Sequence, residues 1–255
     1  MNFNIQPINF NIANVRFKSN SNISQPKGSD LERNPKMDSF EMSIGYVNDA
    51  HGQTNNMMRI LSGIKGDLKL SAGDNDIGDE KNDAIHQATT KFLNIADIKA
   101  SALGNHEIDM SQKDCIDAIN RFNGLMLSIN FEQIPLEEQD PEDIQKYGRA
   151  DLKNHLTKSA VVEVKGEKIG LIGASPIDMM SRLTHPNYYT DCSVDDLDDT
   201  IELIQNEIDK FKEQNINKVI LVSHLGHKAD KFVAENIDGI DVIVGGHTHE
   251  LIKDI

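Results

Sequence analysis

The stretch Ala102-Leu103-Gly104-Asn105-His106-Glu107-Ile108-Asp109 runs from small apolar residues directly into polar residues of the kind that bind metal ions. In a sheet covered on both faces, a buried strand is a short apolar run, and its carboxyl end opens onto the crevice where ligands bind. The stretch is therefore expected to be a strand followed by a functional loop. One ending of this kind carries little weight, because apolar runs before polar residues are common.

Four more apolar runs end in the same way. They are Gly45-Tyr46-Val47-Asn48-Asp49-Ala50-His51, Leu70-Ser71-Ala72-Gly73-Asp74-Asn75, Leu221-Val222-Ser223-His224 and Val244-Gly245-Gly246-His247-Thr248-His249. The carboxyl ends of neighbouring parallel strands meet at one crevice, so residues about two hundred positions apart can form one polar site. The five endings together predict an α/β protein with the site of a metal-dependent hydrolase.

The rest of the chain also follows an α/β pattern. Strand-like apolar runs occupy 42–47, 68–72, 97–103, 125–130, 160–165, 168–174, 218–223 and 240–245. Most are rich in Val, Ile, Leu and Ala, which favours sheets buried on both faces. Helical patterns lie between several of them, over 193–214 with Ser193 as the expected N-cap, over 79–94, and from Ser111 onward. This alternation predicts a layered α/β domain.

Domain organisation follows from the same pass along the chain. The segments 160–165 and 168–174 are joined through Gly166-Glu167, a pattern typical of a β-hairpin, so a mixed sheet is expected. A chain of 255 residues is long enough for one large domain, which we place over 41–255. Residues 1–40 are rich in Asn and Ser and contain Pro and Gly breakers, so we expect a disordered or loosely attached arm.

Composition narrows the classes of partner. With 41 acidic and 26 basic residues, the formal net charge is −15, which opposes binding to the phosphate backbone of nucleic acids. Cys115 and Cys192 are the only cysteines and form no CxxC pair, so we expect ordinary thiols. No apolar run is long enough to cross a bilayer, and no secretory signal is visible at the N-terminus. We therefore expect a cytoplasmic protein without nucleic-acid or membrane partners; the sequence does not indicate an oligomeric state.

Two endings carry pairs of potential ligands at a spacing of two residues. On an extended segment, Asp49 and His51 point the same way and can share one ion. His247 and His249 have the same spacing, and Gly245-Gly246 before them would let the backbone turn sharply after the strand. Each pair alone occurs often by chance. Their joint occurrence with the other endings, in this order and each after a strand, makes chance a poor explanation.

In its motifs DxH, GDN, GNHEID, SHLGH and GGHTHE, the sequence resembles the calcineurin-like metallophosphoesterases, and within them the 5'-nucleotidase branch, over roughly 42–255. The resemblance implies a four-layer α/β/β/α sandwich with mixed sheets and hydrolysis of a small-molecule phosphate ester, most readily a nucleoside monophosphate. Relatives in this branch continue through further core strands and a C-terminal nucleoside-binding domain, whereas this chain ends six residues after His249. We therefore expect that domain to be absent, and the last strands of the sheet could be missing too.

The resemblance also implies a role for each motif residue. Asp49, His51 and His249 would hold a first divalent ion, Asn105, His224 and His247 a second, and Asp74 would bridge them. A shared anionic ligand reduces the repulsion between two nearby ions, and neutral His and Asn complete the coordination without excess charge. The ligand types suit Mn, Zn, Fe, Co or Ni. Each ligand histidine needs a partner that fixes its tautomer, and sequence does not identify these partners.

His106 differs in kind from the ligands. The resemblance assigns it to a catalytic dyad in which Asp109 orients the imidazole, and His106 meets the charge that develops on the phosphoryl group or its leaving oxygen. The alternative is a histidine that only begins a helix, and the surrounding motif favours catalysis.

The other histidines have plainer expectations. His86 and His155 are expected to face solvent, and His185 to occupy an ordinary loop position. His227 would either approach the second ion or cap the helix that follows it. Two alternatives to a nucleotidase stay open, namely hydrolysis of a 2',3'-cyclic nucleotide or other small phosphodiester, and a truncated metal-binding domain without catalysis.

Overall fold

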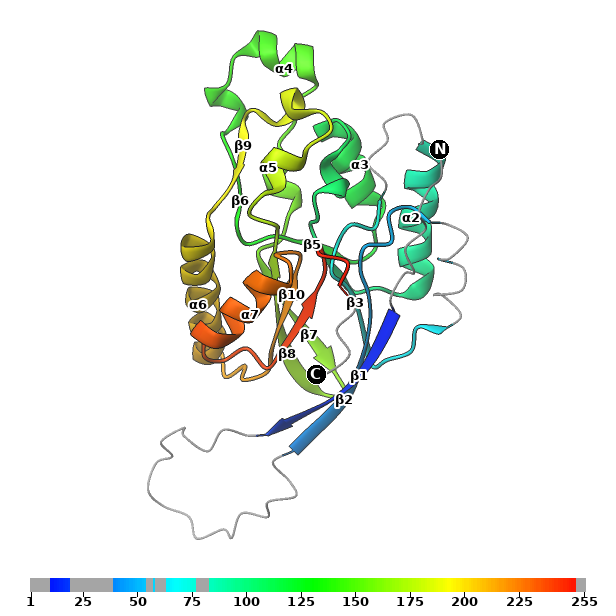
Figure 1. Cartoon of the computed structure of the whole chain (residues 1–255), viewed down its shortest axis with the longest axis vertical. Coiled ribbons are helices and arrows are strands. Elements are labelled where there is room, and N and C mark those ends of the chain that lie inside the picture. Colours follow the sequence, from blue (N-terminus) through cyan, green and yellow to red (C-terminus); the bar gives the residue numbers. More distant parts are fainter. Residues whose placement is uncertain (1–9, 19–38, 54–56, 58–62, 77–82, 251–255) are drawn as a thin grey trace.

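The computed structural model describes residues 10–18, 39–53, 57, 63–76 and 83–250, and their strands form two main sheets (Figure 1). The first sheet contains β1 (Phe10–Lys18), β2 (Ser39–Val47), β3 (Leu68–Ser71), β4 (Ala100–Ala102) and β5 (Leu125–Leu127). Its order is β1-β2-β3-β4-β5, and β2 to β5 are parallel neighbours. Their carboxyl ends therefore lie at one edge.

The second sheet contains β7 (Ser159–Val164), β8 (Glu167–Ala174), β10 (Val219–Ser223) and β11 (Val242–Gly245) in the order β11-β10-β8-β7. Strand β10 is parallel to both neighbours, whereas β7 and β8 form an antiparallel hairpin. The hairpin turn is made by Lys165 and Gly166, whose φ angles of 51° and 84° suit a two-residue turn. The predicted hairpin and mixed sheet are confirmed.

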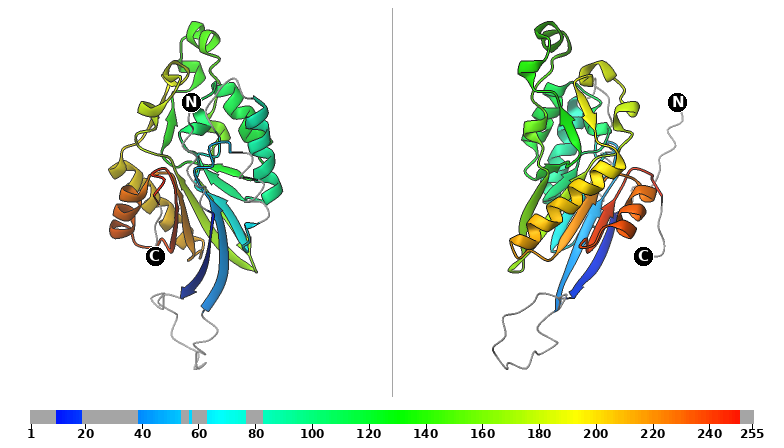
Figure 2. Two further views of the ribbon diagram at one scale, coloured as in Figure 1. Left: turned by 45° about the vertical axis from the view of Figure 1, so that its right-hand side comes forward. Right: turned by 90° about the vertical axis from the view of Figure 1, so that its left-hand side faces the viewer.

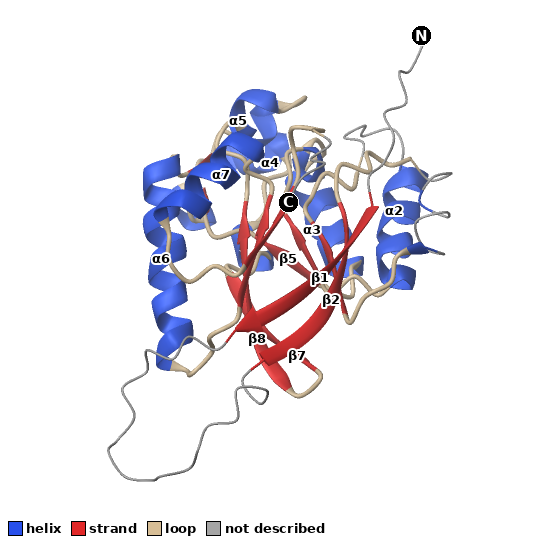
Figure 3. Cartoon of the chain, turned by 60° about the horizontal axis from the view of Figure 1, so that its bottom comes forward, coloured by secondary structure: helices blue, strands red, loops and turns tan. Residues whose placement is uncertain are grey.

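Helices cover the outer face of each sheet, which confirms the four-layer α/β/β/α architecture (Figures 2 and 3). On the first sheet lie α2 (Asp83–Ala96) and α3 (Gln112–Arg121), and on the second lie α6 (Leu197–Glu213) and α7 (His227–Asn236). Apolar side chains of α6 and α7 pack against β8 and β10. No helix in the described part of the chain combines the length and apolar character needed to cross a membrane.

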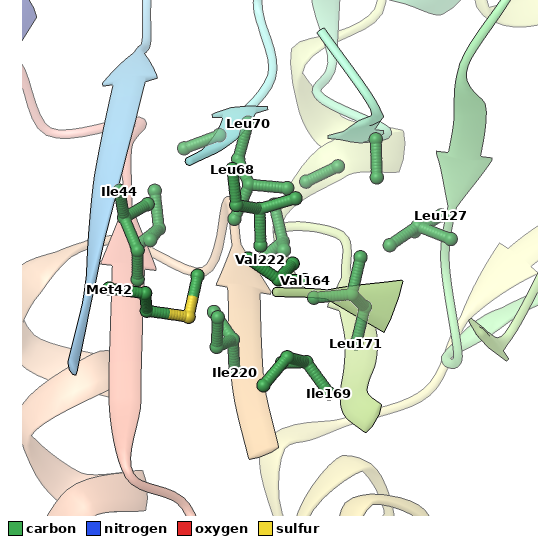
Figure 4. Close-up of a cluster of buried hydrophobic side chains, with 14 residues drawn as sticks. Met42, Ile44, Leu68, Leu70, Leu127, Val164, Ile169, Leu171, Ile220 and Val222 are labelled. Atoms are coloured by element: carbon green, nitrogen blue, oxygen red, sulfur yellow. The ribbon is translucent and has the colours of Figure 1, made fainter. Parts of the chain in front are cut away.

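The space between the two sheets is filled by one apolar cluster (Figure 4). Met42, Ile44, Leu68 and Leu70 come from the first sheet, and Val164, Ile169, Leu171, Ile220 and Val222 from the second. Fully burying one aliphatic side chain contributes roughly 1.5–3 kcal/mol. This shared core therefore holds the edges of the two sheets in a fixed relation to each other.

The remaining strands and α-helices of the described residues lie at the end of the molecule toward which the parallel strands run (Figure 1). They are β6 (Phe131–Gln133), α4 (Pro141–Tyr147), α5 (Met179–Arg182) and β9 (Cys192–Val194), with β6 and β9 paired antiparallel. The buried carboxylate of Asp191 accepts hydrogen bonds from Gln112 (2.8 Å), Gln133 (2.8 Å) and Gln139 (3.0 Å). These bonds tie this end of the molecule to the start of α3.

Helix boundaries correct two expectations. The segment expected to be helical from Ser193 begins with a strand, because Ser193 pairs with Glu132 in the β6–β9 ladder. The helix starts at Leu197, and Asp196 caps it by accepting a hydrogen bond from the Asp199 amide (3.0 Å). The helix expected from Ser111 onward is α3, and Ser111 caps it. The expected start of α2 at residue 79 lies outside the described residues.

The expectation of a loosely attached arm over residues 1–40 is wrong for Phe10–Lys18. This segment is β1, and it pairs antiparallel with β2 along its whole length, from Phe10 opposite Val47 to Lys18 opposite Ser39. Alternating Ala13, Val15 and Phe17 is a strand signal that the Asn-rich composition obscures. Residues 1–9 and 19–38 of the expected arm lie outside the described part of the chain.

Two matched substitutions test whether β1 belongs to the folded sheet. The Val15 side chain packs against the central cluster, whereas Asn14 is exposed. Val15→Asp places a charge against apolar groups and is expected to lower the free energy of unfolding by about 1–3 kcal/mol. Asn14→Asp adds the same charge and should stay within about 0.5 kcal/mol of wild type. Urea denaturation measures both, and equal midpoints would mean that β1 is not docked in solution.

Candidate metal centre

Polar side chains from the strand ends converge in three groups whose ligand atoms lie within 4.8 Å of one another. The groups are Asp49, His51 and His249; Asp74, His224 and His247; and His51, Asp74 and His106. The first group is the set expected for one ion, and the second contains three of the four residues expected around the other. Asp49 Oδ1 also lies 3.9 Å from His224 Nε2, so the groups adjoin.

The backbone brings these side chains together through left-handed turns. Asp49, His51, Asp74, His247 and His249 all have positive φ, between 44° and 79°. Only three other non-glycine residues in the described part of the chain share this conformation, which costs free energy and persists where the surroundings enforce it. The expectation that Asp49 and His51 lie on an extended segment is therefore wrong, because a tight turn aligns them instead.

Three glycines of the motifs, Gly104, Gly245 and Gly246, provide room rather than a left-handed backbone. Neither Gly245 nor Gly246 has a positive φ, so they do not make the turn expected of them. A Cβ on Gly245 would lie 2.4 Å from Asp230 Oδ2, and one on Gly246 would lie 3.0 Å from the Ala72 carbonyl. A Cβ on Gly104 would lie 2.2 Å from Asp74 Oδ1. Gly104 and Gly246 exclude side chains because neighbouring strand ends and loops lie in contact there, and Gly245 excludes one because the Asp230 carboxylate of α7 lies against it.

The two aspartates are held by backbone amides as well as by histidines. The Asp49 carboxylate accepts from the His247 amide at 3.0 and 3.1 Å, and Asp74 Oδ1 accepts from the His106 amide at 2.9 Å. Asp74 Oδ2 lies 3.1 Å from His224 Nε2. Burial alone would raise the pKa of Asp74, but the charge of His224 lowers it below the usual range. Burial would lower the pKa of His224, but the interaction with Asp74 raises it to about 9.

Two histidines have the tautomer-fixing partners that sequence does not identify. His224 Nδ1 lies 2.5 Å from the Ala72 carbonyl oxygen, and His106 Nδ1 lies 2.5 Å from Asp109 Oδ2. In each ring Nε2 is therefore the nitrogen that faces the centre. His51 and His249 bring their Nε2 atoms within 3.0 Å of each other. Burial lowers the pKa of His51, which favours the neutral form that binds metals.

The residues fit a divalent cation on two observations. Asn105 Oδ1 is buried and lacks a hydrogen-bond partner within the described residues, and His224 Nε2 is buried and makes no well-aligned hydrogen bond there, although Asp74 Oδ2 lies 3.1 Å away. Leaving such an atom unsatisfied costs roughly 1–3 kcal/mol, and a cation would satisfy both. The donor set of carboxylate, imidazole and amide oxygen, without thiolate, suits first-row divalent metals.

His106 belongs to the third group and also contacts Asp109, a residue that belongs to none of the three groups. Asp109 is almost fully buried and uses both oxygens, Oδ2 toward His106 Nδ1 and Oδ1 to accept from the Thr184 amide at 2.9 Å. Burial would lower the pKa of His106, but the hydrogen bond to Asp109 raises it. About a third of the His106 side chain is exposed, so its Nε2 can meet a bound molecule. The arrangement can hold a proton on Nε2 of His106.

Glu107 is a central residue that sequence reasoning missed. Its buried carboxylate accepts hydrogen bonds from the amides of Gly104 (2.8 Å), Asp74 (3.0 Å) and Asn75 (2.7 Å), and from Asn75 Nδ2 (3.1 Å). It thereby joins the loop that carries Asp74 to the loop that carries Asn105. The only sequence signal was the position of Glu107 inside GNHEID.

The remaining histidines lie outside the three groups. His86 was expected to face solvent, but it is buried, with Nδ1 2.6 Å from Asp76 Oδ1, because α2 turns this residue toward the loop after β3. His155 is exposed, as predicted. His185 is half-buried before a short 3-10 helix, and His227 is the first residue of α7.

Comparison with known proteins gives consistent matches. The family model for calcineurin-like phosphoesterases matches residues 42–251. The chain is 32% identical to the 5'-nucleotidase of Diplobatis ommata over 63% of this chain and 25% of that protein. It is 27% identical to a probable 5'-nucleotidase of Treponema pallidum over 84% of this chain and 38% of that protein. The solved 5'-nucleotidase precursor from Thermus thermophilus matches with a TM-score of 0.65 at 25% identity, over 83% of this chain and 42% of that one. The chain thus spans less than half the length of each.

Asp230 of α7 contacts the strands that carry part of the centre. Its Oδ1 accepts a hydrogen bond from the Ser223 hydroxyl at 2.5 Å, and its Oδ2 faces Gly245, so it contacts the ends of both β10 and β11. Burial raises the pKa of Asp230 to about 6, against the opposing effect of the Ser223 hydrogen bond. Ionised Asp230 is therefore costly to the folded state.

Asp230→Asn should reveal this cost as a dependence on pH. A folded-state pKa of about 6 against an ordinary value of 3.8 means that the folded protein binds the proton more tightly. Wild-type stability is therefore lost as pH rises from about 4 through 6, by up to about 3 kcal/mol from this group. The free energy of unfolding of Asp230→Asn, relative to that of wild type, should therefore increase by most of this amount between pH 4 and pH 7.

Urea denaturation in the presence of a chelator measures the gain without metal binding. The exposed Asp238→Asn is the control for removal of one charge. A constant difference between Asp230→Asn and wild type across this pH range would contradict the raised pKa.

Proposed function

The chain belongs to the calcineurin-like phosphoesterase family of metal-dependent phosphoester hydrolases, and we propose that it hydrolyses nucleoside monophosphates at a centre of two divalent ions. The observation that carries the proposal is the adjoining pair of ligand groups, one with Asp49 and the other with Asp74. The nucleotide is proposed because the relatives named above are 5'-nucleotidases.

The proposed division of ligands follows the two groups. Asp49, His51 and His249 would hold the first ion, Asn105, His224 and His247 would hold the second, and Asp74 would contact both. Asp74 suits this role because His224 lies at one of its oxygens and the third group places it within reach of His51. Asn105 suits the second ion because its buried Oδ1 has no other partner within the described residues.

When bound, the ions would neutralise charge on the phosphate and make water an effective nucleophile near neutral pH. The protein contributes orientation and a proton. Asp109 holds His106 so that Nε2 faces the centre, and the raised pKa of that imidazole keeps a proton on it over a wider pH range. His106 then donates a hydrogen bond where negative charge develops on the phosphoryl or leaving oxygen.

A substrate panel tests the proposed activity. Chelator-treated protein should release no phosphate, and protein reloaded with Mn²⁺, Zn²⁺ or Co²⁺ should release phosphate from AMP. The panel includes 2',3'-cyclic AMP and an aryl phosphate as the other two ester classes, measured by phosphate and nucleoside release. If none of the three substrates is hydrolysed with any of the metals, catalysis by this chain is refuted. Turnover of the cyclic ester alone would refute the choice of substrate.

Two substitutions distinguish the role of a metal ligand from the role of the His106–Asp109 dyad. His224→Ala should lower both metal content and rate, because it removes a buried ligand. His106→Ala should retain the metals and lose mainly kcat, by about 10²-fold or more, because it removes an interaction that strengthens in the transition state. Metal analysis beside steady-state kinetics distinguishes them, with the exposed His155→Ala as control. Full activity in His106→Ala would overturn the dyad assignment.

A further inference from the structure

The ring of His247 is oriented differently from the other rings of the centre. In His224 and His106 the Nδ1 atom is engaged by an oxygen, which leaves Nε2 toward the centre. In His247 it is Nε2 that lies 3.2 Å from a carboxylate oxygen, Oδ1 of Asp178. A neutral imidazole has one N–H, so the acceptor beside one nitrogen decides which nitrogen carries the free lone pair.

Asp178 is well placed to be that acceptor. It is half-buried immediately before α5, and its Oδ1 atom is fully buried without a well-aligned hydrogen-bond partner in the described part of the chain. Its Oδ2 accepts from Arg182 Nε at 2.5 Å, one helical turn further on. The carboxylate is thus held from behind by Arg182, with its other oxygen directed to His247.

Asp178 itself does not form part of a ligand group. None of the three groups of converging ligand atoms includes it, although one of them includes His247. Its contact with the centre therefore passes through the His247 ring. The backbone of His247 is left-handed, with φ of 79°, and its amide donates to the Asp49 carboxylate.

We propose that Asp178 is a positioning residue that accepts the Nε2–H of His247 and so presents Nδ1 to the pocket shared with Asp74 and His224. The inference rests on the metal centre proposed above. Outer partners of this kind fix the tautomer and ring orientation of a metal-binding histidine and increase its basicity. Asp178 lies in no strand-end motif, so only the folded chain brings it to His247.

The tautomer can be measured directly on the metal-free protein. Nitrogen-15 NMR of histidine-labelled protein at about pH 8.5, where an ordinary imidazole is neutral, should show the Nε2–H form for His247. Signals are assigned by comparison with His247→Gln. An Nδ1–H form in wild type would overturn the proposal whatever the variants do.

Metal affinity gives a second readout. Asp178→Ala should mix the two tautomers and weaken binding of Mn²⁺ or Zn²⁺, titrated by calorimetry, by about 10–100-fold. Asp178→Asn keeps an oxygen acceptor, so it should retain most of the Nε2–H tautomer and most of the metal affinity. Arg182→Gln is the matched control, since it removes the bond behind Asp178 and leaves the oxygen that faces His247 in place.

The outcomes distinguish this inference from the proposed function. Failure of wild-type protein to bind the metals would refute the metal centre. Normal metal binding by wild type, with an unchanged tautomer and affinity in Asp178→Ala, would refute only the role of Asp178. Circular dichroism of each variant confirms that it is folded before either comparison is made.

Discussion

The buried carboxylate of Glu107 is the interaction on which the geometry of the centre depends. Loops that leave parallel strands have amides with no ladder partner, and a buried amide needs an acceptor. One carboxylate satisfies amides from two such loops, at Asp74 and Asn75 on one side and Gly104 on the other. Burial raises the pKa of Glu107 to about 7, and in its ionised form the charge-assisted bonds are stronger than neutral ones, so the two loops are held as a unit.

The strained backbone conformations lie at the strand ends, next to a regular and rigid framework. The strands and the apolar core between the sheets are regular, whereas the left-handed residues gather at the strand ends. Turns of this kind persist only where surrounding contacts over-determine them. Gly104, Gly245 and Gly246 let the loops touch, and Asp49, Glu107 and Asp230 bond across the contacts. The rigid sheets thus hold a set of backbone conformations that isolated loops would not keep.

The sequence predicted the layered architecture and the convergence of the strand ends, because both follow from short apolar runs and from the topology of parallel sheets. It did not predict how Asp49 and His51 align, since spacing alone cannot distinguish an extended segment from a left-handed turn. β1 was missed because composition outweighed a short alternating pattern. His86 and Asp178 show a third limit: their partners, Asp76 and His247, depend on how a helix and a loop pack, and no local pattern records that packing. The assignment of individual residues to each ion stays a prediction.

Asp109 divides its two oxygens between the His106 imidazole and the amide of Thr184 in an exposed segment. The position of that surface segment is therefore coupled to the basicity of His106. Drawing the Thr184 amide away would leave one carboxylate oxygen without its partner, concentrate negative charge on the other, and strengthen the hold of His106 on its proton. Changes of length or composition in the surface segment can thus adjust the working pH of the imidazole while the GNHEID stretch stays the same.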